Sequence, residues 1–195
     1  EVNGKYISGM YGENGKLFGV FDKEGKKINE IVDYPSSSIS YTDAEKRDAY
    51  YANIVSNGKD RIAVCYTMTD LIDIYSISGE LLHRIHGPEQ FFARFNEVRD
   101  GDVVTSAPEK NVNRDAYFSP CSNGERLFVL YDGDYVDSPD NDFSCSYLMV
   151  FSWDGKPEAQ YRLDDPIIAF TIDGVHKKIY GISMIPECHI VEYSF

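Results

Sequence analysis

The chain has 195 residues, of which 32 are acidic and 19 are basic, so its formal net charge is −13. This charge repels phosphate backbones and anionic lipid headgroups, which argues against binding to nucleic acid or to a membrane surface. No apolar run approaches the roughly 18 residues that a membrane-spanning helix needs, so this segment is not expected to insert into a membrane. Aromatic residues make up 14% of the chain, and this bias toward Tyr and Phe favours β-strands.

The first predicted unit covers approximately residues 1–35. A turn at Asn3 and Gly4 precedes its first strand, because Asn and Gly both tolerate the positive φ of tight hairpin turns. Its last two strands are joined at Phe21–Gly25, an aromatic residue followed by three residues and a glycine. Residues 36–46 contain a serine run and are predicted to be a loop.

The second predicted unit covers approximately residues 47–88 and repeats both signatures. An Asn-Gly turn at 57–58 precedes an apolar strand at Arg61–Tyr66, and the aromatic-x-x-x-Gly turn lies at Tyr75–Gly79. The two signature glycines are 21 residues apart, which is the same spacing as in the first unit. A matched spacing of two different signatures indicates an internal repeat.

Two more units complete the repeat, at approximately residues 114–166 and 167–195. In the third unit, the Asn-Gly turn, the apolar strand and the aromatic-x-x-x-Gly turn lie at 123–124, 126–131 and 151–155. The fourth unit has its first turn at Ile172–Gly174 and a strand at Lys178–Ser183. The long link 89–113 before the third unit is predicted to contain a small hairpin around residues 99–104.

Nearly the same five residues precede the Asn-Gly turns of the second and third units. They are Arg47–Tyr51 and Arg114–Phe118. The aromatic residues at their ends, Tyr50, Tyr51, Tyr117 and Phe118, are expected to pack between units rather than to stack on a ligand.

If the strands of a unit are named A to D, the chain reads B-C-D, A-B-C-D, A-B-C-D and A-B-C. Four antiparallel strands per unit, joined by short hairpins, are typical of β-propeller blades. The sequence therefore predicts one all-β domain with about three and a half blades. A β-sandwich is the alternative, and the doubled signature favours the propeller.

These A-B-C-D units resemble those of TolB-like and NHL-like bacterial six-bladed propellers, which carry the same two turns. The resemblance covers nearly the whole chain and implies a location in the periplasm or at the cell surface, with a lipid anchor upstream of this segment. The NHL pattern proper is missing, and no catalytic residue can be carried over. A six-bladed ring needs more strands than this chain supplies, so we expect a missing propeller half or a second chain to pair with the open blade edges.

The segment 132–142 in the third unit is strongly acidic. Its five carboxylates are Asp132, Asp134, Asp137, Asp140 and Asp142. Calcium takes six to eight oxygen ligands. However, Val136 and Asp137 stand where an EF-hand loop needs a ligand and a glycine, so no tight calcium site is expected. A solvated acidic turn is the plainer interpretation.

The histidines and cysteines give no clear catalytic or metal site. His83 and His86 lie three residues apart on a strand and therefore point to opposite faces. His189 follows Cys188 and Glu187, a trio that suggests nucleophilic catalysis, but adjacent side chains on a strand diverge.

The four cysteines are widely spaced and contain no C-x-x-C pair, so buried thiols and disulfides both remain open. Cys145 and Cys188 occupy matching positions and are the pair expected to bridge in an oxidising compartment. Cys65 is expected to be a buried thiol, because it lies in the middle of an apolar strand.

The long links should emerge on one side of a propeller, where loops would carry any binding surface. We therefore predict a non-enzymatic binding or scaffold protein that engages a protein or a glycan, without a metal or cofactor. The five Asp residues of segment 132–142 and His189 are the candidate binding residues. The alternative is a propeller hydrolase or lyase whose site lies over the central channel and is completed by residues outside this chain.

Overall fold

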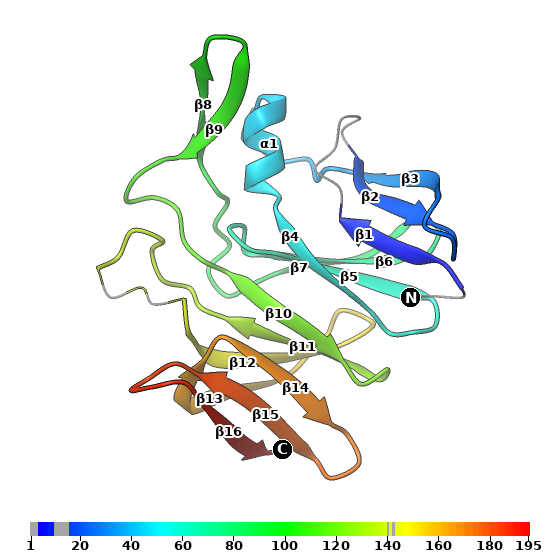
Figure 1. Ribbon diagram of the computed structural model, residues 1–195, viewed down its shortest axis with the longest axis vertical. Helices are drawn as coiled ribbons and strands as arrows, with labels where there is room; N and C mark the ends of the chain where they lie inside the picture. Colours follow the sequence, from blue (N-terminus) through cyan, green and yellow to red (C-terminus); the bar gives the residue numbers. More distant parts are fainter. Residues whose placement is uncertain (1–3, 10–15, 140, 142) are drawn as a thin grey trace.

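The computed structural model describes residues 4–9, 16–139, 141 and 143–195. Within these residues the chain forms four antiparallel sheets, each with its strands paired in chain order, and a separate two-stranded hairpin (Figure 1). The sheets are named blades 1 to 4.

Blade 1 contains β1 (Tyr6–Gly9), β2 (Lys16–Phe21) and β3 (Lys27–Asp33). Blade 2 contains β4 (Ala52–Ser56), β5 (Arg61–Tyr66), β6 (Leu71–Ser76) and β7 (Leu81–His86). Blade 3 contains β10 (Tyr117–Ser122), β11 (Arg126–Tyr131), β12 (Cys145–Ser152) and β13 (Pro157–Ile167). Blade 4 contains β14 (Ala169–Asp173), β15 (Lys178–Ser183) and β16 (His189–Ser194).

The predicted fold class is confirmed: the chain is all-β and forms about three and a half four-stranded blades of a β-propeller. The first strands of successive blades lie beside one another, β4 next to β10 and β10 next to β14 (Figure 1). A separate hydrophobic core fills each of the three junctions between neighbouring blades. The blades are therefore held together by face-to-face packing rather than by shared strands.

The Asn-Gly turns owe their shape to a side chain as well as to the glycine. In blade 2, Asn57 Oδ1 accepts hydrogen bonds from the backbone N–H groups of residues 59–61 at 2.9 to 3.0 Å. Gly58 follows with a φ of 73°, which a side chain would disfavour. Asn123 and Gly124 form the corresponding turn in blade 3. The side-chain bonds fix the turn, and the turn fixes the register of the strands that it joins.

The glycine of the aromatic-x-x-x-Gly turn also fits the turn against the preceding blade. A Cβ at Gly79 would lie 3.2 Å from Cβ of Ile31 on β3, and one at Gly155 would lie 3.0 Å from Cβ of His83 on β7. At Gly25, in blade 1, a Cβ would meet no atom within 4 Å. All three glycines have positive φ, so only the close approach distinguishes them.

A buried carboxylate ties blade 2 to blade 3. Asp70 is 1% exposed and accepts hydrogen bonds from Tyr117 Oη at 2.9 Å and from the backbone N–H groups of Glu89 and Gln90 at 2.8 and 2.7 Å. Gly87 packs directly on this group, because a Cβ there would lie 1.7 Å from Asp70 Oδ1. The donors compensate for the cost of burying the charge.

Aromatic rings occupy the corresponding part of the junction between blades 1 and 2. Tyr50 is 1% exposed. Its ring packs against three other tyrosines, Tyr34, Tyr41 and Tyr66, at centroid distances of 5.5 to 6.1 Å. Its hydroxyl is buried and has no hydrogen-bond partner among the described residues. Ser37 lies close to this hydroxyl, and the hydroxyl of Ser37 itself donates to the carbonyl of Ile39. Burial raises the pKa of Tyr50 above its usual value.

One helix, α1 (Asp43–Ala49), contradicts the prediction of a loop at 36–46. A capping box begins the helix: the Thr42 side chain accepts from the Glu45 N–H, and Glu45 Oε2 accepts from the Thr42 N–H. Ala44 and Ala49 are buried, and Ala49 belongs to the hydrophobic core between blades 1 and 2. The helix is too short for its apolar period to be visible in the sequence.

Because of α1, the repeated five-residue segment adopts two conformations. Arg47–Ala49 ends the helix, whereas Tyr117 already begins β10. The residue opposite the last residue of β5 is Ala52, and the residue opposite the last residue of β11 is Tyr117. The two copies therefore do not occupy equivalent positions in their blades.

The predicted small hairpin in the link before blade 3 is confirmed, and it is longer than expected. It consists of β8 (Phe95–Asp100) and β9 (Val103–Pro108) and extends away from the blades (Figure 1). Its base is closed by reciprocal hydrogen bonds: the Arg94 N–H donates to Asn113 Oδ1 at 2.6 Å, and Asn113 Nδ2 donates to the Arg94 carbonyl at 2.7 Å. The insertion thus leaves and rejoins the fold at one point.

None of the four cysteines forms a disulfide, so the bridge considered between Cys145 and Cys188 is not formed. Cys145 is buried at the start of β12, whereas Cys188 is exposed just before β16. Cys65 is a buried thiol, as predicted, and burial raises its pKa above the usual value.

Candidate functional site

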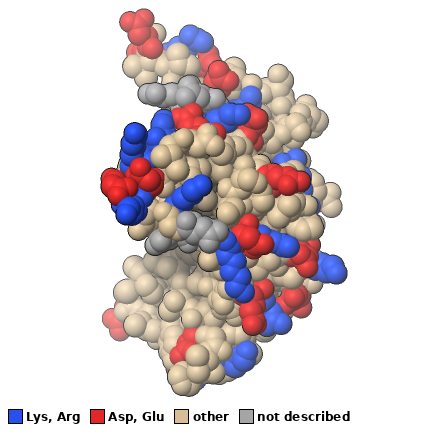
Figure 2. Space-filling model, turned by 90° about the vertical axis from the view of Figure 1, so that its right-hand side faces the viewer, with Lys and Arg blue, Asp and Glu red and all other residues tan. Residues whose placement is uncertain are grey.

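The long links emerge on one side of the molecule, which we call the loop face. Their described residues are 34–51, 87–116, 132–139, 141 and 143–144, and they lie at the left and top of Figure 1. The Asn-Gly turns and the aromatic-x-x-x-Gly turns lie on the opposite side (Figure 1). Figure 2 views that opposite side and shows basic and acidic side chains intermixed from its top to its lower right. The loop face therefore carries most of the structure that is additional to the blades.

Two insertions on the loop face contact each other. Glu45, which caps α1, also accepts a hydrogen bond from the backbone N–H of Glu97 on β8 at 2.8 Å. Asp48, on the same helix, accepts from the hydroxyl of Ser106 on β9. The helix and the hairpin therefore form one unit, although they belong to links before different blades.

The predicted acidic loop is tied down by hydrogen bonds rather than arranged around a common centre. Asp137 Oδ2 accepts from the Asn111 N–H at 2.8 Å, and Asp132 Oδ1 accepts from the Asp134 N–H at 3.4 Å. His189, the remaining candidate, starts β16 in the next blade, where Nδ1 lies 2.7 Å from the Glu187 carbonyl. Two other candidates, Asp140 and Asp142, lie outside the described residues. Across the described ranges, no three His, Cys, Asp or Glu side chains gather as metal ligands would.

Sequence reasoning missed a buried carboxylate beneath this loop. Asp115 is 3% exposed, and its Oδ2 accepts from Asn141 Nδ2 at 2.9 Å. Burial raises the pKa of Asp115, with a smaller contribution in the same direction from the charge of Asp134. The repeated Arg-Asp-Ala-Tyr segment was the only signal in the sequence that pointed to this residue.

Arg114, in the same segment, is held from several directions. Its guanidinium pairs with Glu89 and donates to the Gly133 carbonyl at 2.6 Å from Nε. The rings of Phe91 and Tyr135 lie 5.1 and 5.4 Å from it, within the range of cation–π contacts. The chain's own carboxylate and aromatic side chains thus surround the Arg114 guanidinium.

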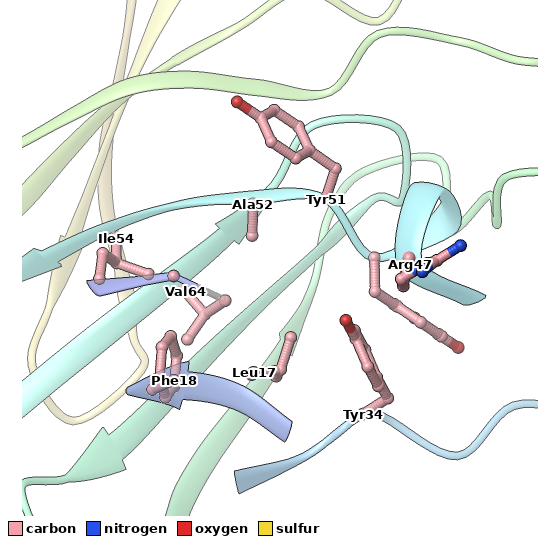
Figure 3. Close-up of a pocket in the computed structure, with 10 residues that line it drawn as sticks. Leu17, Phe18, Tyr34, Arg47, Tyr51, Ala52, Ile54 and Val64 are labelled. Carbon is pink, nitrogen blue, oxygen red and sulfur yellow. The ribbon is translucent and has the colours of Figure 1, made fainter. Parts of the chain in front are cut away.

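A cavity of about 200 Å³ opens between blades 1 and 2 (Figure 3). Its apolar wall consists of Leu17, Phe18, Ala52, Ile54 and Val64. In Figure 3 the Tyr34 hydroxyl points toward the cavity, Arg47 lies at the rim and the Tyr51 ring turns away from it. Within the described part of the chain, Arg47 makes no ion pair or hydrogen bond through its guanidinium. The cavity could accept an apolar side chain, with polar groups only at its edge.

Over the described ranges, no helix has the length and apolar character needed to cross a membrane.

Comparisons with known proteins identify similarity only at the level of folded structure. No protein family matches the sequence, and no curated protein matches it. Among solved structures, the chain is similar to BamB from Moraxella catarrhalis, with a TM-score of 0.42 and 10% sequence identity. The match covers 98% of this chain and 56% of the BamB chain, so this chain spans little more than half the length of that protein.

Proposed function

We propose that this protein is a non-enzymatic binding or scaffold propeller of the bacterial envelope, located in the periplasm or at the cell surface. The observation that carries the proposal is the loop face, where α1 and the β8–β9 hairpin join into one projecting unit. The blades beneath serve as a rigid support for this unit, as in many proteins whose binding loops stand on a scaffold. Its partner is a protein or a glycan.

The buried carboxylates favour binding over catalysis. Asp70 and Asp73 accept hydrogen bonds from groups of the fold, and Asp115 accepts one from Asn141. A catalytic acid or base needs a carboxyl group that can reach a substrate. These three side chains instead support the packing of blades and loops, which is the role expected in a scaffold.

We also propose that the chain is part of one six-bladed propeller of the TolB-like or NHL-like type. Blade 1 exposes Tyr6 (47%) and Ile28 (49%), and blade 4 exposes Ile182 (39%) and Ile190 (75%). Equivalent faces inside the molecule are packed against a neighbouring blade. The free faces of blades 1 and 4 would therefore contact the missing propeller half or a second chain.

Two exposed valines on opposite sides allow a matched test of the loop face. Val103 on β9 is 64% exposed, and Val175 in the short turn between β14 and β15 is 86% exposed. Partners retained by the immobilised protein from an envelope extract, or from a glycan array, would be quantified for Val103→Asp and Val175→Asp. We expect Val103→Asp to reduce retention and Val175→Asp to leave it unchanged. The reverse pattern would contradict the proposal.

A further inference from the structure

A second cavity, of about 300 Å³, lies near the outer part of the junction between blades 1 and 2. Its lining is rich in hydrogen-bond donors: residues 36–38, which are all serines, together with Arg84, His86, Leu71 and Phe92. None of these residues is Asp or Glu, although the chain as a whole carries a net charge of −13. The cavity is therefore a local exception to the acidic character of the protein.

Arg84 is held in one orientation by a buried partner. Its Nε and Nη2 donate to the two carboxylate oxygens of Asp73, both at 2.8 Å. Asp73 is 0% exposed and also accepts from the hydroxyls of Tyr66 and Tyr75 at 3.1 and 3.0 Å. The hydrogen bonds to Asp73 raise the pKa of the Arg84 guanidinium, so it remains charged.

The opposite edge of the guanidinium remains available to a ligand. Arg84 has five N–H donors, and within the described ranges only Nε and Nη2 are bonded, both to Asp73. Its side chain is 27% exposed and lines the cavity next to His86. A fixed guanidinium with free donors suits a carboxylate, because little side-chain entropy is lost when the ligand binds.

The chain itself shows how it satisfies a guanidinium on the loop face. In the link between blades 2 and 3, the residue after Pro88 is Glu89, and its carboxylate pairs with Arg114. In the link between blades 1 and 2, the residue after Pro35 is Ser36, which lines the cavity at Arg84 and carries a hydroxyl in place of a carboxylate.

We propose that the Arg84 cavity binds the carboxylate of a Glu or Asp side chain from a protein partner. The hydroxyls of Ser36 and Ser38, together with His86, would donate to the second carboxylate oxygen, and Phe92 would contact the apolar part of the side chain. This inference rests on the proposed binding role of the loop face and names the chemistry that one part of it recognises. It can fail while the binding role holds, because α1 and the hairpin could still engage a partner.

Two short peptides provide the probe. Acetyl-Pro-Glu-Gln-Phe-amide reproduces residues 88–91 of this chain, and acetyl-Pro-Gln-Gln-Phe-amide differs from it only by the missing carboxylate. Titration into the isotopically labelled protein would be followed by NMR at the Arg84 Nε–H and at the amides of residues 36–38. We expect the Glu peptide to shift these signals saturably and to bind at least about tenfold more tightly than the Gln peptide.

A pair of substitutions separates filling of the cavity from unfolding. Arg84→Gln would leave Asp73 buried without its partner, so loss of binding in that variant could reflect misfolding. Ser36→Glu should instead place an internal carboxylate at Arg84 and abolish binding of the Glu peptide, while Ser36→Gln should still bind it. Equal binding by the two peptides, or an unchanged affinity of Ser36→Glu, would overturn the proposal. It would equally be overturned if glucuronate shifted the same signals and the Glu peptide did not, because the site would then recognise acidic glycans.

Discussion

The junction between blades 2 and 3 and the junction between blades 1 and 2 use the same sheet packing but different chemistry. In the first, the Asp70 carboxylate accepts three hydrogen bonds and leaves no space beside Gly87. In the second, tyrosine rings pack around a hydroxyl without a partner among the described residues, and a cavity of about 200 Å³ remains. A repeated fold can therefore vary the polarity of its junctions while it keeps the geometry of its blades. The polar junction should tolerate change poorly, and the aromatic junction should tolerate it well.

Gly87→Ala should have the largest effect and would break the polar junction. Its Cβ would lie 1.7 Å from Asp70 Oδ1 and 2.3 Å from Tyr117 Oη, so the carboxylate must move away from its donors. We expect a loss of about 3 kcal/mol or more in the free energy of unfolding, measured by urea denaturation. Gly174→Ala is the control, because its Cβ would come no closer than 3.9 Å to another residue. Equal effects of the two substitutions would show that the Asp70 contacts contribute little.

Gly155→Ala and Gly25→Ala would measure what close blade packing adds to the same turn. Both glycines have a φ of 75° to 79°, so both substitutions introduce a similar backbone strain of about 1 kcal/mol. Only Gly155 would also press on His83 in the preceding blade, at 3.0 Å. We expect Gly155→Ala to lose about 1 kcal/mol more stability than Gly25→Ala, as judged by the urea midpoint. A greater loss for Gly25→Ala would be inconsistent with this assignment.

Removal of a single hydroxyl compares the two junctions most directly. Tyr117→Phe removes a 2.9 Å hydrogen bond to a buried carboxylate and should cost about 1.5 to 2 kcal/mol. Tyr50→Phe removes a buried hydroxyl without a partner among the described residues and should change stability by less than about 0.5 kcal/mol, or increase it. Thermal unfolding of the two variants under identical conditions would test this. A larger loss for Tyr50→Phe would indicate an unrecognised partner at the aromatic junction.

The smallest expected effect is the pH dependence that Asp115 contributes. Burial raises its pKa in the folded state, so the folded protein binds a proton more readily than the unfolded chain does. Its contribution should therefore be most favourable below the unfolded value of about 3.8 and should be lost as the pH rises through the raised folded pKa. The difference in unfolding free energy between the wild type and Asp115→Asn, measured across pH, should follow this course. A difference that is independent of pH would contradict it.

The sequence predicted the strands better than the links. β5, β11 and β15 begin and end where expected, because an Asn-Gly or Asp-Gly turn and an apolar run define each of them. Helix α1 was missed, since seven residues give no visible period, and the Thr42–Glu45 capping box was its only local sign. Each of these strands is marked in the sequence by a turn and an apolar run. The start of α1 is marked only by the pair of hydrogen bonds between Thr42 and Glu45.

The candidate site could be predicted only in outline. The sequence placed the long links on one side, and Figure 1 shows them there. It did not show that Asp73 orients Arg84 or that Glu89 reaches Arg114, because these pairs are 11 and 25 residues apart. The acidic loop attracted attention through its composition, yet its described carboxylates form local bonds. Composition identified where charge is concentrated, and the fold determines which charged groups meet.

The closed base of the β8–β9 hairpin makes this insertion an exchangeable cassette. Arg94 and Asn113 bond to each other on either side of it, so the ends of the insertion stay together whatever lies between them. A chain cut at the hairpin tip would still hold both ends in place, and a different loop could be grafted between the same two residues without disturbing blade 3. The molecule thus has a natural position at which its outward-facing structure can be replaced, provided that an apolar residue is kept at Phe95, which packs against the core between blades 1 and 2.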